Sequence, residues 1–201
     1  MAFHPCTDVG FEGWAQGMED AGVNTEWDMY DSHIQHLILR YNDHLRDMGD
    51  FIPIDWRLIK AMIWTETGAK NRQWKTLPMQ IGIRTDPGMH DLLTDPNRRL
   101  VVLPDLWSHF TKSQIRTNPY INIEAGISLL LMRMAHFRST PNFHSFANAH
   151  FRSGIVSWRS FTPQTIFMRY NQGDGCYARK LIYCMRLIHS IKTDGRQKKA
   201  S

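Results

Sequence analysis

Apolar residues that recur at intervals of three and four constrain the fold of this chain more than any other feature. Between Ser32 and Gly49 the apolar positions follow this helical period, with Ser32 as the N-cap and Gly49 as the C-terminal stop. A second such stretch begins at the N-cap Asp55 and ends near Gly68. No stretch alternates apolar and polar residues over the length of a strand. We therefore predict an all-α fold.

The C-terminal half carries further helical patterns. Asn122 is predicted to cap a strong amphipathic helix that reaches about Phe137 and forms the centre of the core. Additional helices are predicted over 143–151 and 163–170, and a last one from Tyr177 to Ile188.

A stretch from Lys70 to Pro119 separates the second predicted helix from the central one. It holds five prolines and several Asp-Pro or Asn-Pro pairs, which are typical of loops. Only 103–110 has a weak helical pattern, and a small β-hairpin is predicted at 79–84. We expect substrate-binding loops in this stretch.

Charge and composition divide the chain into parts. Residues 1–50 hold two Arg and ten Asp or Glu, a net charge of −8, whereas residues 51–201 carry a net charge of +13. We predict an irregular, aromatic N-terminal segment over 1–30, which packs on the domain or joins it to an upstream one. The main helical domain is predicted to span 31–191, and a basic flexible tail 192–201.

The composition excludes some classes of protein and leaves others open. With 42% apolar residues the chain can bury a core, and no apolar run approaches the roughly 18 residues that span a bilayer. The basic part favours polyanions such as nucleic acid or the acidic polymers and peptides of cell wall. A basic nucleic-acid-binding module is thus one alternative, although the arginines are scattered and no helix-turn-helix spacing is present.

Cysteine and histidine indicate neither a metal site nor a nucleophile. An odd number of cysteines without a CxxC spacing implies neither a zinc site nor a disulfide framework, so free thiols are expected. Histidine pairs occur without an HExxH frame or a third ligand. We predict no metal and no cofactor. The residues concerned are Cys6, Cys176, Cys184, His33, His36, His144 and His150.

Glu66 is the residue with the clearest chemical signal. It falls three residues after Ile63 and four after Met62, on the stripe that faces the core, and in the last turn of its helix. Burial and the helix dipole would both raise the pKa of a carboxyl there, as a general acid requires. The periodicity alone favours a simpler interpretation, in which Glu66 faces solvent or pairs with Lys60 or Lys70.

Four short motifs add to this pattern. In chain order they are IDWRLIKAMIWTETGA, LPMQIG, NIEAGISLLL and RYNQGDG, and they lie within about residues 54–190. This order resembles that of the lytic transglycosylase and goose-type lysozyme superfamily. The resemblance implies a lysozyme-like helical domain that cleaves peptidoglycan.

Position by position, the resemblance makes Glu66 the acid that protonates the glycosidic oxygen between N-acetylmuramic acid and N-acetylglucosamine. It implies substrate-binding roles for Thr67, Met79, Gln80, Tyr170 and Asn171. The phenol of Tyr170 is expected to approach the catalytic carboxylate while the amide of Asn171 contacts sugar. It also implies structural roles for Asn122 and Gly126. From the residues alone, Met79 could equally be a core methionine and Tyr170 a packed aromatic.

The second carboxylate, which decides the reaction type, departs from the family pattern. Goose-type lysozymes place an Asp two residues after the Gln, where this chain has Gly82, and the loop before Gln80 is shorter than expected. Asp86 is the better candidate replacement and Asp91 the other, although an Asp before Pro is often a turn former. A hydrolase needs such a group. Without it, the substrate's own 6-hydroxyl gives a 1,6-anhydro product, as in lytic transglycosylases. We slightly favour hydrolysis.

The N-terminal sequence lacks the pattern of a signal peptide. We therefore expect delivery to the periplasm or cell wall by a secretion system or a holin, or as part of a larger chain, as for an antibacterial effector or an endolysin. An immunity protein or an upstream delivery domain would then be a partner. A non-catalytic peptidoglycan-binding subunit remains an alternative, although such a subunit has no need of Glu66.

Overall fold

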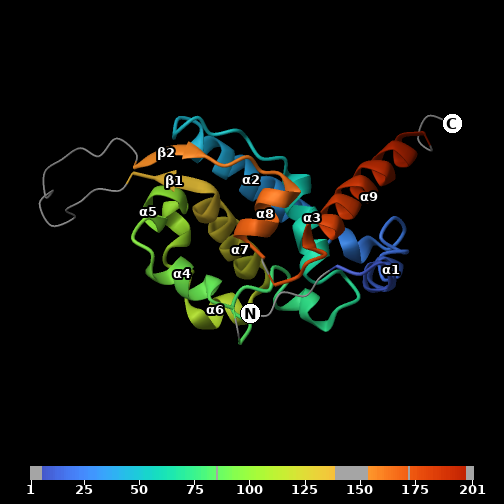
Figure 1. Ribbon diagram of the computed structural model, residues 1–201. Helices are drawn as coiled ribbons and strands as arrows, with labels where there is room; N and C mark the ends of the chain where they lie inside the picture. The colour runs from blue at the N-terminus through green and yellow to red at the C-terminus, as the bar shows by residue number, and fades with distance from the viewer. Residues whose placement is uncertain (1–5, 85, 139–153, 172, 198–201) are drawn as a thin grey trace, which may run out of the picture.

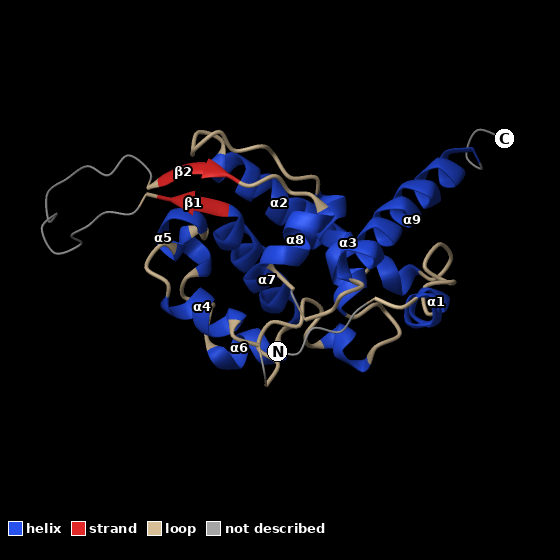
Figure 2. Ribbon diagram, viewed as in Figure 1, coloured by secondary structure: helices blue, strands red, loops and turns tan. Residues whose placement is uncertain are grey.

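The computed structural model describes residues 6–84, 86–138, 154–171 and 173–197. This part of the chain is mainly helical with one small antiparallel sheet, as Figures 1 and 2 show, and the predicted helical class is confirmed. The α-helices are α1 (Asp8–Gln16), α2 (Asp31–Leu45), α3 (Trp56–Glu66), α4 (Gly88–Thr94), α5 (Arg98–Val101), α6 (Lys112–Thr117), α7 (Pro119–Met134), α8 (Pro163–Arg169) and α9 (Tyr177–Gln197). Short 3-10 helices are η1 (Thr25–Asp28), η2 (Arg72–Lys75) and η3 (Pro104–Leu106), and the strands are β1 (Ala135–Phe137) and β2 (Ile155–Trp158).

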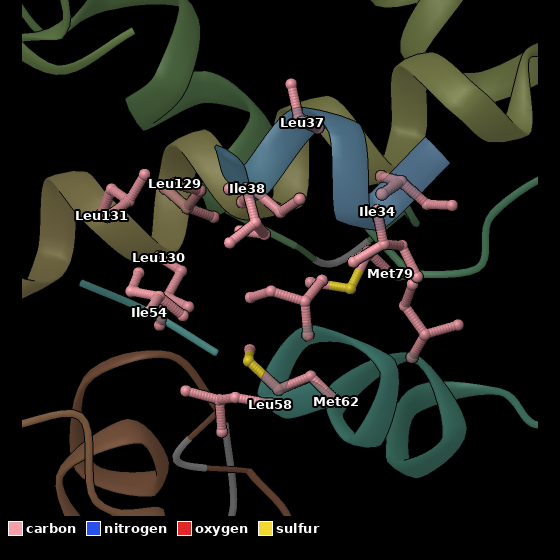
Figure 3. Close-up of a cluster of buried hydrophobic side chains, with 14 of the residues drawn as sticks. Ile34, Leu37, Ile38, Ile54, Leu58, Met62, Met79, Leu129, Leu130 and Leu131 are labelled. Atoms are coloured by element: carbon pink, nitrogen blue, oxygen red, sulfur yellow. The ribbon is translucent and has the colours of Figure 1, made fainter. Parts of the chain in front are cut away.

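Helices α2, α3 and α7 form the centre of the core. Figure 3 shows their apolar side chains in one cluster, together with Ile54 and Met79. Most residues of α7 are buried, so its role as the central helix is confirmed. One polar contact joins α2 to α7 inside this core, because the Tyr41 hydroxyl and Ser128 Oγ lie 2.6 Å apart.

The ends of α3 are fixed by the residues that the sequence indicates. Asp55 caps the first turn, its side chain accepting a hydrogen bond from the Arg57 N–H at 2.9 Å. At the other end Gly68 has a φ of +68°, and a Cβ there would lie 3.0 Å from the Trp27 ring. A glycine is therefore required where the chain leaves α3, which places Glu66 at the last position of the helix.

Asn118, not Asn122, caps the central helix. The Asn118 side chain accepts hydrogen bonds from the N–H groups of Tyr120 and Ile121, and Pro119 suits the first helical position. Asn122 is instead fully buried one turn later. Its amide oxygen accepts a hydrogen bond from Met79 N, and its amide N–H₂ donates to Ile81 O and Ile115 O, at 2.8 to 2.9 Å. Asn122 therefore has a structural role, as expected.

The stretch between α3 and α7 contains more helix than predicted. It folds into η2, α4, α5, η3 and α6. The hairpin predicted at 79–84 is wrong: residues 79–84 form turns, and the small sheet joins β1 to β2 elsewhere in the chain. The helix predicted over 143–151 lies outside the described residues, whereas α8 matches the one predicted over 163–170.

Both ends of the described chain differ from the predicted irregular segments. Residues 8–16 form α1, capped by the Thr7 side chain, and α9 continues to Gln197 instead of ending near residue 191. Phe11 and Trp14 of α1 pack edge-on against Tyr183 of α9, with ring centroids 5.8 Å apart. Figure 1 shows α1 and α9 together at one end of the molecule.

The expectation of free thiols is wrong for two of the three cysteines. A disulfide joins Cys6 to Cys176, which are 170 positions apart in sequence, and only Cys184 is a free, buried thiol. No spacing rule could pair residues so distant, because the fold alone brings them together. Among the described residues, no helix is long and apolar enough to cross a membrane.

Candidate active site

Glu66 lies at the point where α3 meets α9 and the loop before it. The apolar stripe of α3 directs the last turn of the helix inward, so the Glu66 side chain is largely covered although its backbone is at a helix end. Neither lysine considered as a partner reaches it. Lys60 pairs with Asp28 and Asp31, and Lys70 pairs with Asp20, so the alternative in which Glu66 pairs with either lysine is wrong.

The surroundings of Glu66 keep its carboxyl protonated near neutral pH. Burial raises the pKa of Glu66 to about 7, because a carboxylate loses the hydration that stabilises its charge. The Tyr177 hydroxyl and the Asn171 amide oppose this rise in pKa, and the nearby carboxylates of Asp86 and Asp174 add to it. Glu66 is therefore suited to donate a proton at neutral pH.

A cleft of about 990 Å³ opens beside Glu66. Its volume is at the upper end of the range for ligand sites, and its lining combines apolar and polar groups as such sites do. The loop between η2 and α4 lines one wall, and α7, α8 and the residues after α8 line the other. These residues include Glu66, Met79, Gln80, Asp86, Leu129, Arg133, Phe167, Arg169, Tyr170 and Asn171.

Gln80 and Met79 reach the cleft, but both also hold the fold together. The Gln80 amide N–H₂ donates to the main-chain carbonyl of Glu66, and its φ of +53° is unusual for a residue with a side chain. Met79 is 1% exposed and fits closely on Gly126, where a Cβ would lie 2.7 Å from that of Met79. Gly126 therefore has a structural role, as expected, because the absence of a side chain lets Met79 pack closely against α7.

Thr67 is not brought to the cleft. Its hydroxyl donates to the carbonyl oxygens of Ile63 at 3.2 Å and Pro78 at 3.0 Å, and Thr67 is not among the residues that line the cleft. The structure thus places Thr67 as a link between the end of α3 and the loop of Gln80, which corrects its predicted role in substrate binding.

The aromatic and amide groups around Glu66 are arranged differently from the prediction. The Asn171 amide, expected on sugar, faces the carboxylate with Nδ2 at 3.4 Å from Glu66 Oε1. The Tyr170 hydroxyl donates to Met79 O at 3.5 Å. The phenol that lowers the pKa of Glu66 is that of Tyr177. Its buried hydroxyl makes no hydrogen bond of good geometry among the described residues.

Asp86 shares the cleft with Glu66, and Asp91 does not. The Asp86 carboxylate accepts hydrogen bonds from the N–H groups of Gly82 at 3.0 Å and Gly88 at 2.8 Å. Asp86 therefore forms a turn, which is one of the interpretations that the sequence allows, and it also lines the cleft. Asp91 instead pairs with Arg133 at 3.1 Å.

No family model, curated protein or solved structure matches this chain. The likeness to lysozymes and lytic transglycosylases consequently depends on the four motifs and on the residues around Glu66.

Two further groups of the site, the phenol of Tyr177 and the carboxylate of Asp174, were not identified from the sequence. Tyr177 belongs to the apolar stripe of the last predicted helix, and no feature of its spacing separates it from a core residue. Asp174 raises the pKa of Glu66, while its own carboxylate accepts from Cys176 N at 2.9 Å and Lys180 Nζ at 2.7 Å. Its place in the glycine-rich segment GDG suggested only a turn.

Arg133 and Arg169 line the cleft, and Arg159 contacts Arg133. Arg133 donates to the carbonyl oxygens of Arg169 and Tyr170 at 3.2 and 3.0 Å, and Arg159 donates to that of Arg133 at 3.0 Å. Asp91 is the one acidic side chain paired with this group within the described residues. The exposed Arg169 side chain therefore leaves positive charge at the cleft mouth.

Proposed function

We propose that this protein cleaves the glycan strands of peptidoglycan between N-acetylmuramic acid and N-acetylglucosamine, with Glu66 as the general acid. The observation that carries the proposal is a largely covered carboxyl with a pKa of about 7, at the wall of a cleft large enough for sugar rings. The resemblance of the motifs around Glu66, Gln80 and Asn171 supplies the substrate class.

In the first step the protonated Glu66 gives its proton to the glycosidic oxygen, and the bond from that oxygen to C1 of N-acetylmuramic acid breaks. Asn171 orients the carboxyl, because its amide can donate to Oε1. Gln80 fixes the end of α3 through the Glu66 carbonyl, which keeps the acid at one position relative to the cleft.

Asp86 supports hydrolysis as the favoured outcome. It is close enough to Glu66 to raise the pKa of that carboxyl, and two backbone N–H groups hold its own carboxylate in one orientation. A fixed carboxylate in the same cleft as a general acid can activate water or attack C1. Capture of C1 by the substrate's 6-hydroxyl, as in lytic transglycosylases, is the alternative, and it would leave Asp86 with its turn-forming role alone.

The test is Glu66→Gln on purified peptidoglycan. The variant should release muropeptides about 10² to 10⁴ times more slowly, because general-acid catalysis contributes rate factors of this size, and its thermal midpoint should not fall. Glu124→Gln is the matched control. Glu124 is also a largely buried carboxyl with a raised pKa, but it lies beside His33 at 3.5 Å and outside the cleft.

More than about a tenth of the wild-type rate in Glu66→Gln would remove Glu66 as the acid. Loss of activity in both variants would point to a general loss of structure, and circular dichroism would check this.

A further inference from the structure

The Cys6–Cys176 disulfide lies next to a residue of the candidate active site, although the sequence motifs gave no indication of it. Cys176 is 7% exposed and directly precedes Tyr177, the first residue of α9. The segment from Asn171 to Tyr177 therefore carries a contact of Glu66 at each end, with the disulfide just before the second one.

Between Asn171 and Tyr177, which is itself buried in the core, the hydrogen bonds of the described residues are local. Asp174 accepts from Cys176 N and Lys180 Nζ, and Asn171 Oδ1 accepts from Gly173 N at 3.2 Å. These bonds lie within the segment or tie it to the first turns of α9. Gly173 and Gly175 add conformational freedom, because glycine restricts the backbone least. Among the described residues, the disulfide is thus its one covalent tie to a distant part of the chain.

On the other side of the disulfide, Cys6 leads into α1, which is itself held against α9. Asp8 pairs with Arg179 at 2.6 Å, the Arg179 guanidinium lies 3.9 Å from the Phe11 ring centroid, and Lys180 lies 5.3 Å from that of Trp14. None of the α1 residues is fully buried. The disulfide therefore connects a mostly exposed helix to the start of α9, next to Tyr177.

We propose that the Cys6–Cys176 disulfide positions Asn171 and Tyr177 against Glu66, so that the protein is fully active only when this disulfide is formed. The inference rests on the proposed function. Reduction takes two electrons and two protons and gives two thiols, and a dithiol reductant that closes to its own cyclic disulfide supplies both. In the cytosol, thiols would keep the disulfide reduced, and Asn171 and Tyr177 would not be held against Glu66. An oxidising compartment such as the periplasm would allow the disulfide to form.

A positioning role and a merely structural role give different results. Burial is the main cause of the raised pKa of Glu66, so release of the segment admits water and lowers that pKa from about 7 toward the ordinary value. A disulfide that only stabilises the fold would lower the thermal midpoint and leave the pKa of Glu66 unchanged in the folded protein.

The experiment compares oxidised protein, protein reduced with dithiothreitol, and Cys6→Ser, all below the unfolding midpoint. Cys6 is exposed ahead of α1, so this variant disturbs the core least. The readouts are muropeptide release, its pH profile, and titration of Glu66 by NMR of labelled glutamate. We expect reduction and Cys6→Ser each to slow release about tenfold to a hundredfold, as small misplacements in active sites do, and to lower the pKa of Glu66.

The Cys184→Ala variant is the control for thiol chemistry, because Cys184 is the free, buried thiol. It should keep its sensitivity to dithiothreitol, whereas Cys6→Ser should show none. Equal rates and equal Glu66 titration in folded oxidised and reduced protein would overturn the proposal. So would unfolding of both reduced protein and Cys6→Ser, since the disulfide would then act on the whole fold. Absence of glycan cleavage by the oxidised protein would instead reject the proposed function, and the NMR titration would still test the inference.

Discussion

The Asp86 carboxylate accepts a hydrogen bond from the backbone N–H of Gly82, with 3.0 Å between N and Oδ2. If the motifs correspond to those of goose-type lysozymes, Gly82 stands where that family has an Asp. Its φ of +89° and the contacts that a Cβ would make, 3.0 Å to Met89 Sδ and 3.2 Å to Arg116 Cγ, disfavour any side chain there. Asp86 therefore places a carboxylate beside the backbone of Gly82, a position at which a side chain is disfavoured.

This relationship predicts that Asp86 decides the reaction products. If Asp86 activates water or attacks C1, wild-type protein should release muropeptides with reducing ends, and Asp86→Asn should lose most of them. Mass spectrometry of the released fragments measures this. Asp91→Asn, which removes a carboxylate paired with Arg133 outside the cleft, is the matched control.

Products lighter by one water and without a reducing end would show capture by the substrate's 6-hydroxyl. That outcome, or undiminished reducing-end products from Asp86→Asn, would end the role of Asp86 as the second carboxylate.

A second prediction concerns stability and pH. The folded protein holds the Glu66 proton up to a pH of about 7, whereas an ordinary glutamate loses it near 4.5. The free energy of unfolding should therefore fall as pH rises through this window, because the folded state binds more protons than the unfolded state. Glu66→Gln stays neutral and escapes this loss, so it should gain about 1 to 3 kcal/mol over wild type between the two pH values.

Urea unfolding on either side of the window measures the difference. Glu12→Gln, which changes an exposed glutamate of α1, should follow the pH dependence of the wild type. A difference between Glu66→Gln and wild type that stays constant with pH would mean that Glu66 titrates as an ordinary carboxyl.

A third prediction separates the two tyrosines near Glu66. Because the Tyr177 hydroxyl lowers the pKa of Glu66, Tyr177→Phe should raise that pKa and move the alkaline limb of the pH–rate profile upward. The direction is opposite to that expected for reduction of the disulfide. Tyr170→Phe should have a smaller effect on the profile, because its hydroxyl donates to Met79 O. Tyr183→Phe is the control on the same helix, and an unchanged profile in Tyr177→Phe would leave Tyr177 as a packing residue.

The parts of the fold that could be predicted are those governed by local rules. The period of α3, its cap Asp55 and the glycine after it place Glu66 in the last turn on the core-facing stripe, because they require no knowledge of distant residues. The periodicity alone does not decide whether its side chain faces solvent. The order of the four motifs then indicates which segments meet at the site. Gln80, Tyr170 and Asn171 do line one cleft with Glu66.

The parts that could not be predicted depend on tertiary contacts. The short helices between α3 and α7 bury few residues each, and their patterns are too brief to stand out from loops. Either Asn118 or Asn122 can cap a helix, and the choice depends on the three buried bonds of Asn122 to other segments. Tyr177 and Asn171, and not Tyr170, contact the Glu66 carboxyl, because of the directions that the side chains take after α8. The spacing of residues in the sequence does not determine these directions.

The last prediction concerns the arginines of the cleft. The exposed Arg169 side chain lines the cleft and pairs with no acidic side chain within the described residues, while the peptide stems of peptidoglycan carry carboxylates. Arg169→Gln should therefore raise KM for peptide-bearing glycan about fivefold, near the 1 kcal/mol of an exposed ion pair, and leave KM unchanged for glycan stripped of peptides. Arg186→Gln, an exposed arginine of α9, is the control. Because the interaction is between exposed charges, salt should weaken it in the wild type and have less effect in Arg169→Gln. Equal KM changes on both substrates would show that Arg169 contacts sugar or supports the cleft wall instead.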